Sequence, residues 1–279
     1  MVSGRRVLSM VYAVVVYLFL LAPILVILLS SLTTTNYIVF PPRGLTLRWY
    51  GELFAHHPEF ISSLWLSIAV AVGTAVGCTV FGTLAALALH RYPVPGKGIW
   101  NALFASPLLI PSVVLGIALL QWYSTLGIAA SSWSLIIGHF IIAFPYVVRL
   151  VMARLQEFQS SHVERAAANL GASPVQVFWK VTLPLIRSGM MAGAVFAFVT
   201  SFDDLTVALF VVSTDVQTLP VRLFNYMQYN YDPVVTAISS VMVLLSLVMM
   251  IAMERVIGIG QAFGVSKTHT TKRGTVHAH

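Results

Sequence analysis

The chain has 279 residues, of which 58% are hydrophobic and only 9% are charged. A soluble domain carries about 25% charged residues, so this chain has too little charge to cover a water-facing surface. The net charge of +7 comes from scattered rather than clustered basic residues, which argues against a nucleic-acid-binding protein. The composition therefore indicates a membrane protein.

Six long apolar runs predict an all-α integral membrane protein with six transmembrane helices. About 20 apolar residues cross the hydrocarbon core of a bilayer, and a helix satisfies its own backbone hydrogen bonds there. The runs cover residues 7–31, 60–89, 99–123, 133–153, 188–212 and 234–257. The first run follows Arg5 and Arg6 but is too long for a signal peptide and lacks a cleavage site, so we expect an uncleaved anchor.

The distribution of Lys and Arg predicts the orientation in the membrane, because cytoplasmic loops are enriched in these residues. Six spans place both termini on one side. If that side is the cytoplasm, only Arg43, Arg48 and Arg222 of the 16 basic residues fall in outer loops. We therefore predict a transmembrane domain over residues 1–264 with cytoplasmic termini, an outer segment at 213–232, and a polar cytoplasmic tail at 265–279.

Shorter features give further expectations. An amphipathic stretch around Trp49 and Leu53 predicts a short interfacial helix. The lone Cys78 is expected to be core packing, and no metal site is predicted. Four prolines lie inside the apolar runs, where they indicate either kinks or the lining of a pathway; they are Pro23, Pro107, Pro111 and Pro145.

A polar inner loop at 158–187 separates the fourth and fifth runs. Its segment "VERAAANLGA" is rich in helix formers, and Gly171 stands where a helix commonly ends. Ser173 is a capping residue and Pro174 suits a first helical turn, so a second helix is expected to begin there. The loop is thus predicted to form a rigid knob of two helices joined at a glycine turn, able to dock another protein.

At these residues the chain resembles the membrane permease subunits of ATP-binding-cassette (ABC) importers. The signature of that family is E-A-A, three residues, G, nine residues, I-x-L-P. The signature glutamate position holds Arg165, with a glutamate one residue earlier, and Val181 replaces the isoleucine. The resemblance implies that the ATPase-coupling residues are Glu164, Ala166, Ala167, Gly171, Leu183 and Pro184.

The resemblance implies a type I ABC importer permease with a cytoplasmic coupling-helix loop, located in the bacterial inner membrane. Its expected partners are an ATPase dimer, a second permease subunit that is a paralogue, an external substrate-binding protein and membrane lipid. The chain contains no G-x-x-x-x-G-K-[ST] phosphate-binding loop. We therefore expect no catalytic residue and no cofactor in this chain, with ATP and magnesium bound by the partner ATPase.

The C-terminal half narrows the resemblance. The segments "SFDDLTVALFV" and "TLPVRLFNYMQYNYDP" are similar to permeases of polyamine importers of the spermidine/putrescine type. Related branches that carry opines, phosphonates or ferric iron share parts of this pattern, so the substrate stays open among them.

Asp203 and Asp204 are the only acidic residues well inside an apolar run. A carboxylate in the membrane is costly, by about 2.5–3.5 kcal/mol at a helix centre on insertion scales, and by default marks a function. A polycation could pass by a carboxylate and aromatic faces, for which the candidates are Phe202, Tyr146 and Trp122. Alternatively, the aspartates cap a broken helix or pair with an arginine or with Asn225.

Two rival functions remain. An ion-coupled secondary transporter would use intramembrane carboxylates, but it would leave the inner knob without a role. A membrane enzyme would need a catalytic set. The candidates inside the apolar runs are His139 and the two aspartates, without an evident His-x-x-His or Ser/His/Asp pattern.

Overall fold

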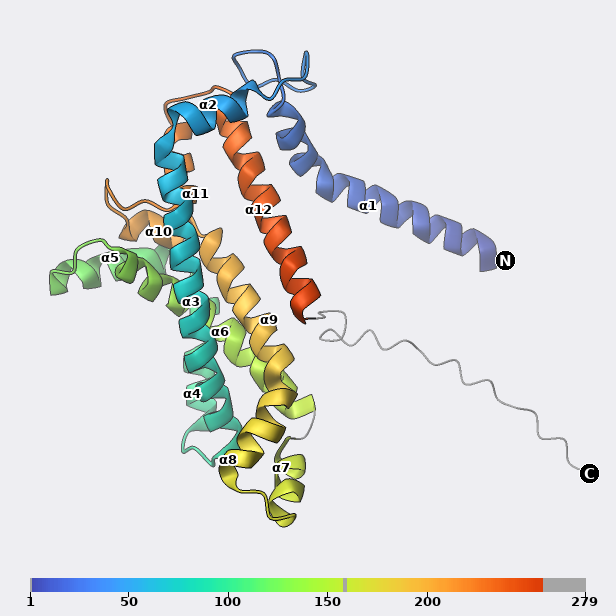
Figure 1. The fold of residues 1–279 in the computed structure, drawn as a ribbon, viewed down its shortest axis with the longest axis vertical. Helices are drawn as coiled ribbons and strands as arrows, with labels where there is room; N and C mark the ends of the chain where they lie inside the picture. Colours follow the sequence, from blue (N-terminus) through green and yellow to red (C-terminus); the bar gives the residue numbers. More distant parts are fainter. Residues whose placement is uncertain (1, 158–159, 258–279) are drawn as a thin grey trace, which may run out of the picture.

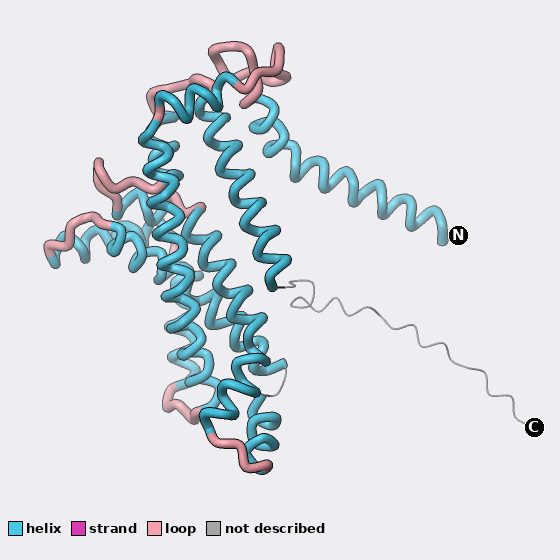
Figure 2. Tube along the Cα trace, in the orientation of Figure 1, coloured by secondary structure: helices cyan, strands magenta, loops and turns pink. Residues whose placement is uncertain are grey.

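The computed structural model describes residues 2–157 and 160–257, and every regular element within these ranges is helical (Figure 2). The expected tail at 265–279 and the start of the predicted loop, 158–159, lie outside the described residues. The elements are α1 (Val2–Ser30), α2 (Arg48–His56), α3 (Pro58–Arg91), α4 (Lys97–Ala105), the 3-10 turn η1 (Ser106–Leu108), α5 (Ser112–Leu126), α6 (Ser132–Glu157), α7 (Ser160–Asn169), α8 (Pro174–Val177), the π-helical η2 (Phe178–Thr182), α9 (Leu183–Phe202), α10 (Thr206–Val211), α11 (Leu219–Met227) and α12 (Val234–Ile257).

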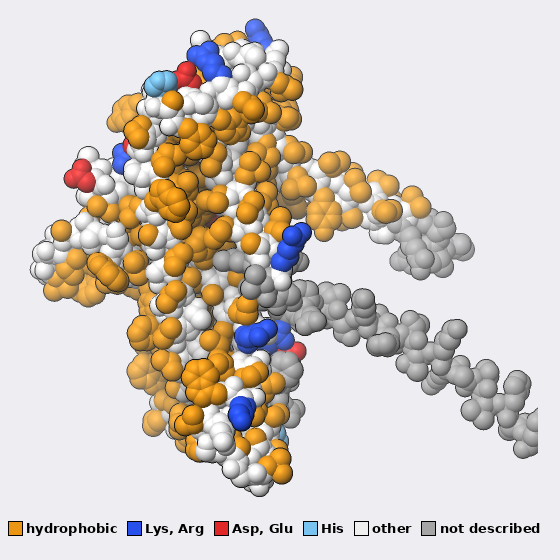
Figure 3. Space-filling model, in the orientation of Figure 1, with side chains coloured by type: hydrophobic (Ala, Val, Ile, Leu, Met, Phe, Trp, Pro, Cys, Tyr) orange, Lys and Arg blue, Asp and Glu red, His pale blue; other side chains and the backbone are white. Residues whose placement is uncertain are grey.

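Five helical stretches of the described chain are long and apolar enough to cross a membrane. A sixth crossing results if the bent pair made of 97–108 and α5 is one span. Hydrophobic side chains cover most of the face shown in Figure 3, and charged side chains are few on it. The prediction of an all-α membrane protein is confirmed.

Two of the predicted spans are not single helices. The run 99–123 divides into α4 with η1 and then α5, and the two parts are bent by 99°. Pro107 and Pro111 lie at this bend, where each lacks a backbone N–H to continue the helix. The run 188–212 ends as α9 at Phe202 and resumes as α10 at Thr206. Hydropathy alone does not register such breaks, because the residues on both sides stay apolar.

The centre of the fold is formed by α3, α6 and α9, which pack against one another (Figure 1). Close approach depends on glycine where α9 meets α6: a Cβ added at Gly193 would lie 3.0 Å from the Cα of Val147, and one at Gly189 would lie 2.8 Å from the carbonyl oxygen of Leu150. Small residues spaced four apart allow membrane helices to pack backbone to backbone. The apolar core at this junction includes Ala143, Val147, Ile186 and Phe198.

The remaining helices surround this centre. Helix α12 contacts α1, α2, α9 and α11, and the N-terminal half of α1 projects away from the bundle (Figure 1). The predicted interfacial helix is present as α2, with Trp49 and Leu53 buried. Cys78 is buried in the central core, as predicted. We call the end of the bundle that carries α7 and α8 the knob end, and the end that carries α2 and α11 the far end (Figure 1).

Candidate functional site

The polar loop forms a knob of two helices joined by a glycine turn, as predicted; we define the knob as residues 160–182. Helix α7 closes through hydrogen bonds from the N–H groups of Gly171 and Ala172 to the carbonyl oxygens of Ala168 and Ala167. Gly171 has φ +86°, a left-handed conformation that favours glycine. Ser173 then caps α8 in a reciprocal pair of hydrogen bonds with Gln176. The knob is therefore fixed by local hydrogen bonds.

An ion pair ties the knob to the bundle. The Glu164 carboxylate accepts hydrogen bonds from Arg91 at the end of α3 (2.8 Å) and from the Thr182 hydroxyl of η2 (2.7 Å). Arg91 also lies 2.7 Å from that hydroxyl, so the three side chains close a ring. The Glu164 side chain is only 14% exposed. The acidic group of the loop is thus engaged within the chain, and it braces α7 against α3 and the start of α9.

The other predicted coupling residues divide between exposed and supporting positions. Ala166 is exposed and Ala167 half-buried on α7, and the neighbouring Leu170 at the tip of the knob is 90% exposed. Leu183 and Pro184 lie in the first turn of α9. Because Pro184 has no N–H for the carbonyl of residue 180, the helix widens into η2 just before it. The knob therefore presents small and apolar side chains and rests on a distorted helix start.

A second polar cluster lies at the break between α9 and α10. Asp204 accepts a hydrogen bond from the N–H of Ala208 (2.9 Å), an otherwise unsatisfied donor of the first turn of α10. The imidazole of His139 lies beside it, with its Nε2 3.5 Å from Asp204 Oδ2, which is long for a hydrogen bond. The His139 Nδ1 is 2.7 Å from the hydroxyl of Ser201. Asp204 thus has a structural role, which the capping alternative anticipated.

Asp203 has different surroundings. It is exposed, and the Ser246 hydroxyl of α12 approaches its carboxylate at 3.4 Å. It lines a cavity of about 410 Å³ between α1, α11 and α12, together with Ser239 and Ser246. Ser239 and Ser246 are seven residues apart and so lie on one face of α12. Of the two aspartates, Asp203 is the one that faces open space.

The predicted aromatic partners each contact another aromatic ring. Phe202 is buried and stacks on Phe198 within the central core. Tyr146 stacks on Phe196 of α9, with ring centroids 6.1 Å apart. Trp122 lies half-exposed on α5 and contacts Tyr123. Asn225, the alternative partner of the aspartates, approaches Gln217 instead.

The structure brings together a Ser/His/Asp set that has no evident pattern in the sequence, made of Ser201, His139 and Asp204. Thr74 of α3 adjoins Ser201 at 3.4 Å. His139, Ser201 and Thr74 are all buried, so no substrate reaches the hydroxyl. The set is therefore a polar network between helices. Groups of acidic, cysteine or histidine side chains that could hold a metal are absent from the described residues.

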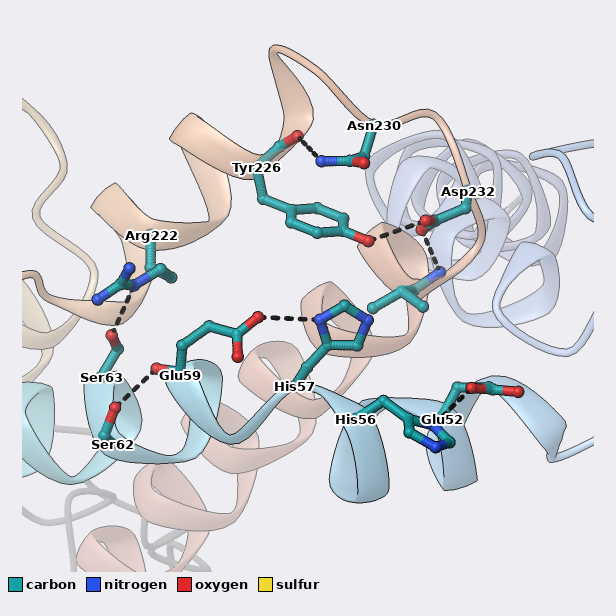
Figure 4. A network of polar contacts seen from close by, with 11 residues as sticks. Glu52, His56, His57, Glu59, Ser62, Ser63, Arg222, Tyr226, Asn230 and Asp232 are labelled. Carbon is teal, nitrogen blue, oxygen red and sulfur yellow. Dashed lines mark hydrogen bonds and ion pairs between the residues drawn. The ribbon is translucent and has the colours of Figure 1, made fainter.

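The far end carries a network that connects His57, the residue between α2 and α3, with α3, α11 and the start of α12 (Figure 4). The His57 ring contacts Glu59 at 2.9 Å and meets Tyr226 edge to face. The Tyr226 hydroxyl donates to Asp232 (2.8 Å), and Arg222 donates to Ser63. Partial burial, together with the hydrogen bond to Asp232, raises the pKa of the Tyr226 hydroxyl. This network fixes α11 against the start of α3 and the start of α12.

Some functional residues were missed because their partners are distant in sequence. Arg91 and Thr182 are 73 and 18 residues from Glu164. Ser201 is 62 residues from His139. The sequence contains one local signal for the break between α9 and α10. Asp favours the start of a helix, so two consecutive aspartates inside an apolar run indicate an interruption.

Comparisons with known proteins agree with this architecture. The family described as "Binding-protein-dependent transport system inner membrane component" matches residues 79–257. The spermidine/putrescine transport system permease protein PotC of Escherichia coli (strain K12) is 32% identical over 239 residues, covering 86% of this chain and 89% of PotC. The putrescine transport system permease protein PotI of the same strain is 31% identical over 232 residues, covering 80% of this chain and 81% of PotI.

The chain also resembles a solved structure of the MetNI methionine ABC transporter in inward-facing conformations. The match covers 72% of this chain and 97% of the transporter chain, with a TM-score of 0.62 and 20% sequence identity. The fold is thus that of an ABC importer permease, a multi-pass membrane subunit. The chain belongs to the family of inner-membrane components of binding-protein-dependent transport systems.

Proposed function

We propose that this chain is the permease subunit of an ATP-driven importer for a polyamine of the spermidine/putrescine type. The observation that carries the proposal is the similarity to PotC over 86% of the chain. The exposed Asp203 at an open cavity supports it, because a carboxylate attracts the ammonium groups of a polyamine. Asp203, rather than the capping Asp204, is the pathway residue in this proposal.

In the proposed complex the knob docks into a cleft of an ATPase subunit. The small Ala166 and the exposed Leu170 would enter the cleft, and Arg165 would lie at its rim. The Glu164 brace holds the knob at a fixed angle to the bundle. ATP and magnesium would be bound by the ATPase, and this chain would hold no cofactor and catalyse no reaction.

The proposal also orients the chain in the bacterial inner membrane. The knob end and both termini face the cytoplasm, and the far end, with α11, faces the substrate-binding protein. A paralogous second permease would complete the pathway. Single cysteines test the orientation: one at Asp215 should react with an impermeant thiol reagent added outside, and one at Ser173 should not. The opposite labelling pattern would show that the orientation is the reverse of the proposed one, and it would not bear on the fold.

The substrate is tested by reconstituting the complete importer in proteoliposomes. We expect binding protein loaded with spermidine or putrescine to stimulate ATP hydrolysis and to support uptake of labelled polyamine. If binding protein loaded with an opine, a phosphonate or ferric iron stimulates ATP hydrolysis instead, the assigned substrate is wrong. The assignment as an ATP-driven importer is then unaffected. Uptake driven by an ion gradient without ATP would favour the secondary transporter and contradict the proposal.

A matched pair of variants tests the pathway residue. Asp203→Asn removes the charge at the cavity, and we expect polyamine uptake to fall by roughly tenfold or more, the scale of a lost charged hydrogen bond. In Asp204→Asn the amide oxygen can still accept from Ala208, so uptake should stay within a few-fold of the wild type. Equal loss in both variants, with normal assembly, would contradict the assignment of Asp203.

A further inference from the structure

A cavity of about 320 Å³ lies between α4 and α6 toward the knob end, apart from the cavity of Asp203. Its apolar lining includes Phe104 of α4 with Val148 and Met152 of α6, and its polar groups are Arg149, Asn101 and Gln156. Its volume is at the lower end of the range of about 300–1,000 Å³ found for small-molecule sites. The lining thus combines one cation, two amides and an apolar wall.

The cation in this cavity has no counterion within the described part of the chain. Arg149 is exposed and makes no ion pair there. The neighbouring acidic group on α6, Glu157, is engaged by Arg154 at 2.6 Å. No acidic residue lines the cavity. The guanidinium group is therefore free to receive an anion.

The depth of Arg149 in the membrane helix makes a counterion energetically important. Arg149 belongs to α6 and lies four residues, or about 6 Å along the helix, before the end of the apolar run at residue 153. An arginine costs about 2.5–3.5 kcal/mol at the centre of a membrane helix, and it lowers this cost by reaching toward the headgroups. Pairing with an anion at headgroup depth removes the cost most directly.

Helix α4, on the other side of the cavity, carries residues that are typical of headgroup depth. Lys97 and Asn101 are four residues apart and share one face of α4, so a second cation lies one turn beyond the cavity toward the knob end. Trp100 on the same helix is 44% exposed, and tryptophan is typical of the boundary between headgroups and hydrocarbon. Two cations and a tryptophan beside the cavity are the side chains expected at the level of the phospholipid phosphates.

We propose that this cavity binds an anionic phospholipid. The guanidinium group of Arg149 would hold the phosphate through paired hydrogen bonds, and the amides of Asn101 and Gln156 would donate to the remaining headgroup oxygens. An acyl chain would lie along Phe104 and Met152. A guanidinium group repels a polyamine, so this site is distinct from the proposed solute pathway at Asp203.

Native mass spectrometry of the delipidated importer complex, titrated with phosphatidylglycerol or phosphatidylethanolamine, tests the site. We expect the wild type to retain phosphatidylglycerol preferentially. Arg149→Gln should weaken this retention about tenfold, the scale of a charged hydrogen bond, and Ala105→Phe should weaken it by filling the cavity. Arg187→Gln, which removes an exposed cation from α9, is the matched control and should behave as the wild type.

Several results would overturn the proposal. Equal retention of the two lipids, or equal loss in Arg149→Gln and Arg187→Gln, would indicate only general attraction of anionic lipid. Full displacement of phosphatidylglycerol by inorganic phosphate would indicate a phosphate site. Loss of the second permease in Arg149→Gln, without lipid retention by the wild type, would indicate that a carboxylate of that subunit is the counterion. The assay does not depend on transport, so its outcome is separate from that of the proposed function.

Discussion

The ion pair between Arg91 and Glu164 predicts how firmly the knob is held. Glu164→Gln keeps the shape of the side chain and removes the charge that receives the Arg91 guanidinium at 2.8 Å. The two side chains are 27% and 14% exposed, so water screens the pair less than it screens a surface pair. Exposed pairs contribute about 0.2–1 kcal/mol, and breaking a buried pair costs about 3–5 kcal/mol. The intermediate burial predicts a loss of about 2 kcal/mol.

Hydrogen exchange of the α7 amides, followed by mass spectrometry, measures this loss as a local opening free energy. A loss of about 2 kcal/mol corresponds to roughly 30-fold faster exchange in α7, since about 1.4 kcal/mol is tenfold. Arg91→Gln should give a similar acceleration. The double variant should exchange little faster than either single variant, because each change already removes the same interaction. Amides of α12, distant from the knob, serve as the internal control.

Unchanged exchange of the α7 amides in Glu164→Gln would show that the ion pair does not hold the knob. Additive effects of the two substitutions would likewise show that Arg91 and Glu164 act separately. If exchange is unchanged while the ATPase no longer associates, Glu164 contacts the ATPase directly, as the family resemblance alone would suggest. The experiment therefore separates a brace within the chain from a bridge to the partner.

Three further substitutions test other parts of the structure. Gly171→Leu should strain the knob by about 1–2 kcal/mol, because residue 171 has φ +86°. Copurification of the ATPase should then fall while membrane insertion continues. Gly171→Asn should have a smaller effect, and equal effects of the two substitutions would contradict a role of the backbone conformation. Gly193→Val should lower the melting temperature in detergent by crowding Val147, at about 1–3 kcal/mol; an unchanged melting temperature would refute the close packing. His139→Leu should remove the short contact with Ser201 and destabilise the protein more than His139→Gln; equal stability would contradict a structural role of the network.

The sequence was sufficient for features that depend on local chemistry. The apolar runs predicted a helical membrane protein, and the pattern of Gly171, Ser173 and Pro174 predicted the glycine turn and the new helix after it. These features follow from neighbouring residues, since caps and turns form within a few positions. The two breaks in the predicted spans were expected only as alternatives, from the prolines and from the paired aspartates, because hydropathy averages over about 20 residues and does not register them.

The role of Glu164 and the difference between Asp203 and Asp204 could not be predicted from the sequence. Each depends on a contact between helices: Arg91 with Glu164, and His139 with Asp204. A sequence without aligned relatives carries no signal for pairs separated by more than 60 residues. Adjacent aspartates look equivalent in a sequence, and only the position of α10 assigns one to its first turn and leaves the other at the cavity.

The two polar clusters lie at opposite ends of one helix. Thr182, which belongs to the brace, directly precedes α9, and Ser201, which contacts His139, lies in its last turn. Helix α9 is continuous over its 20 residues, which corresponds to a length of about 30 Å. One continuous helix, α9, therefore connects the knob to the break at Asp203, so a movement of the knob relative to α3 would also move this break. Close packing of Gly189 and Gly193 on α6 leaves α9 little room to bend, so it would transmit such a displacement as a rigid body.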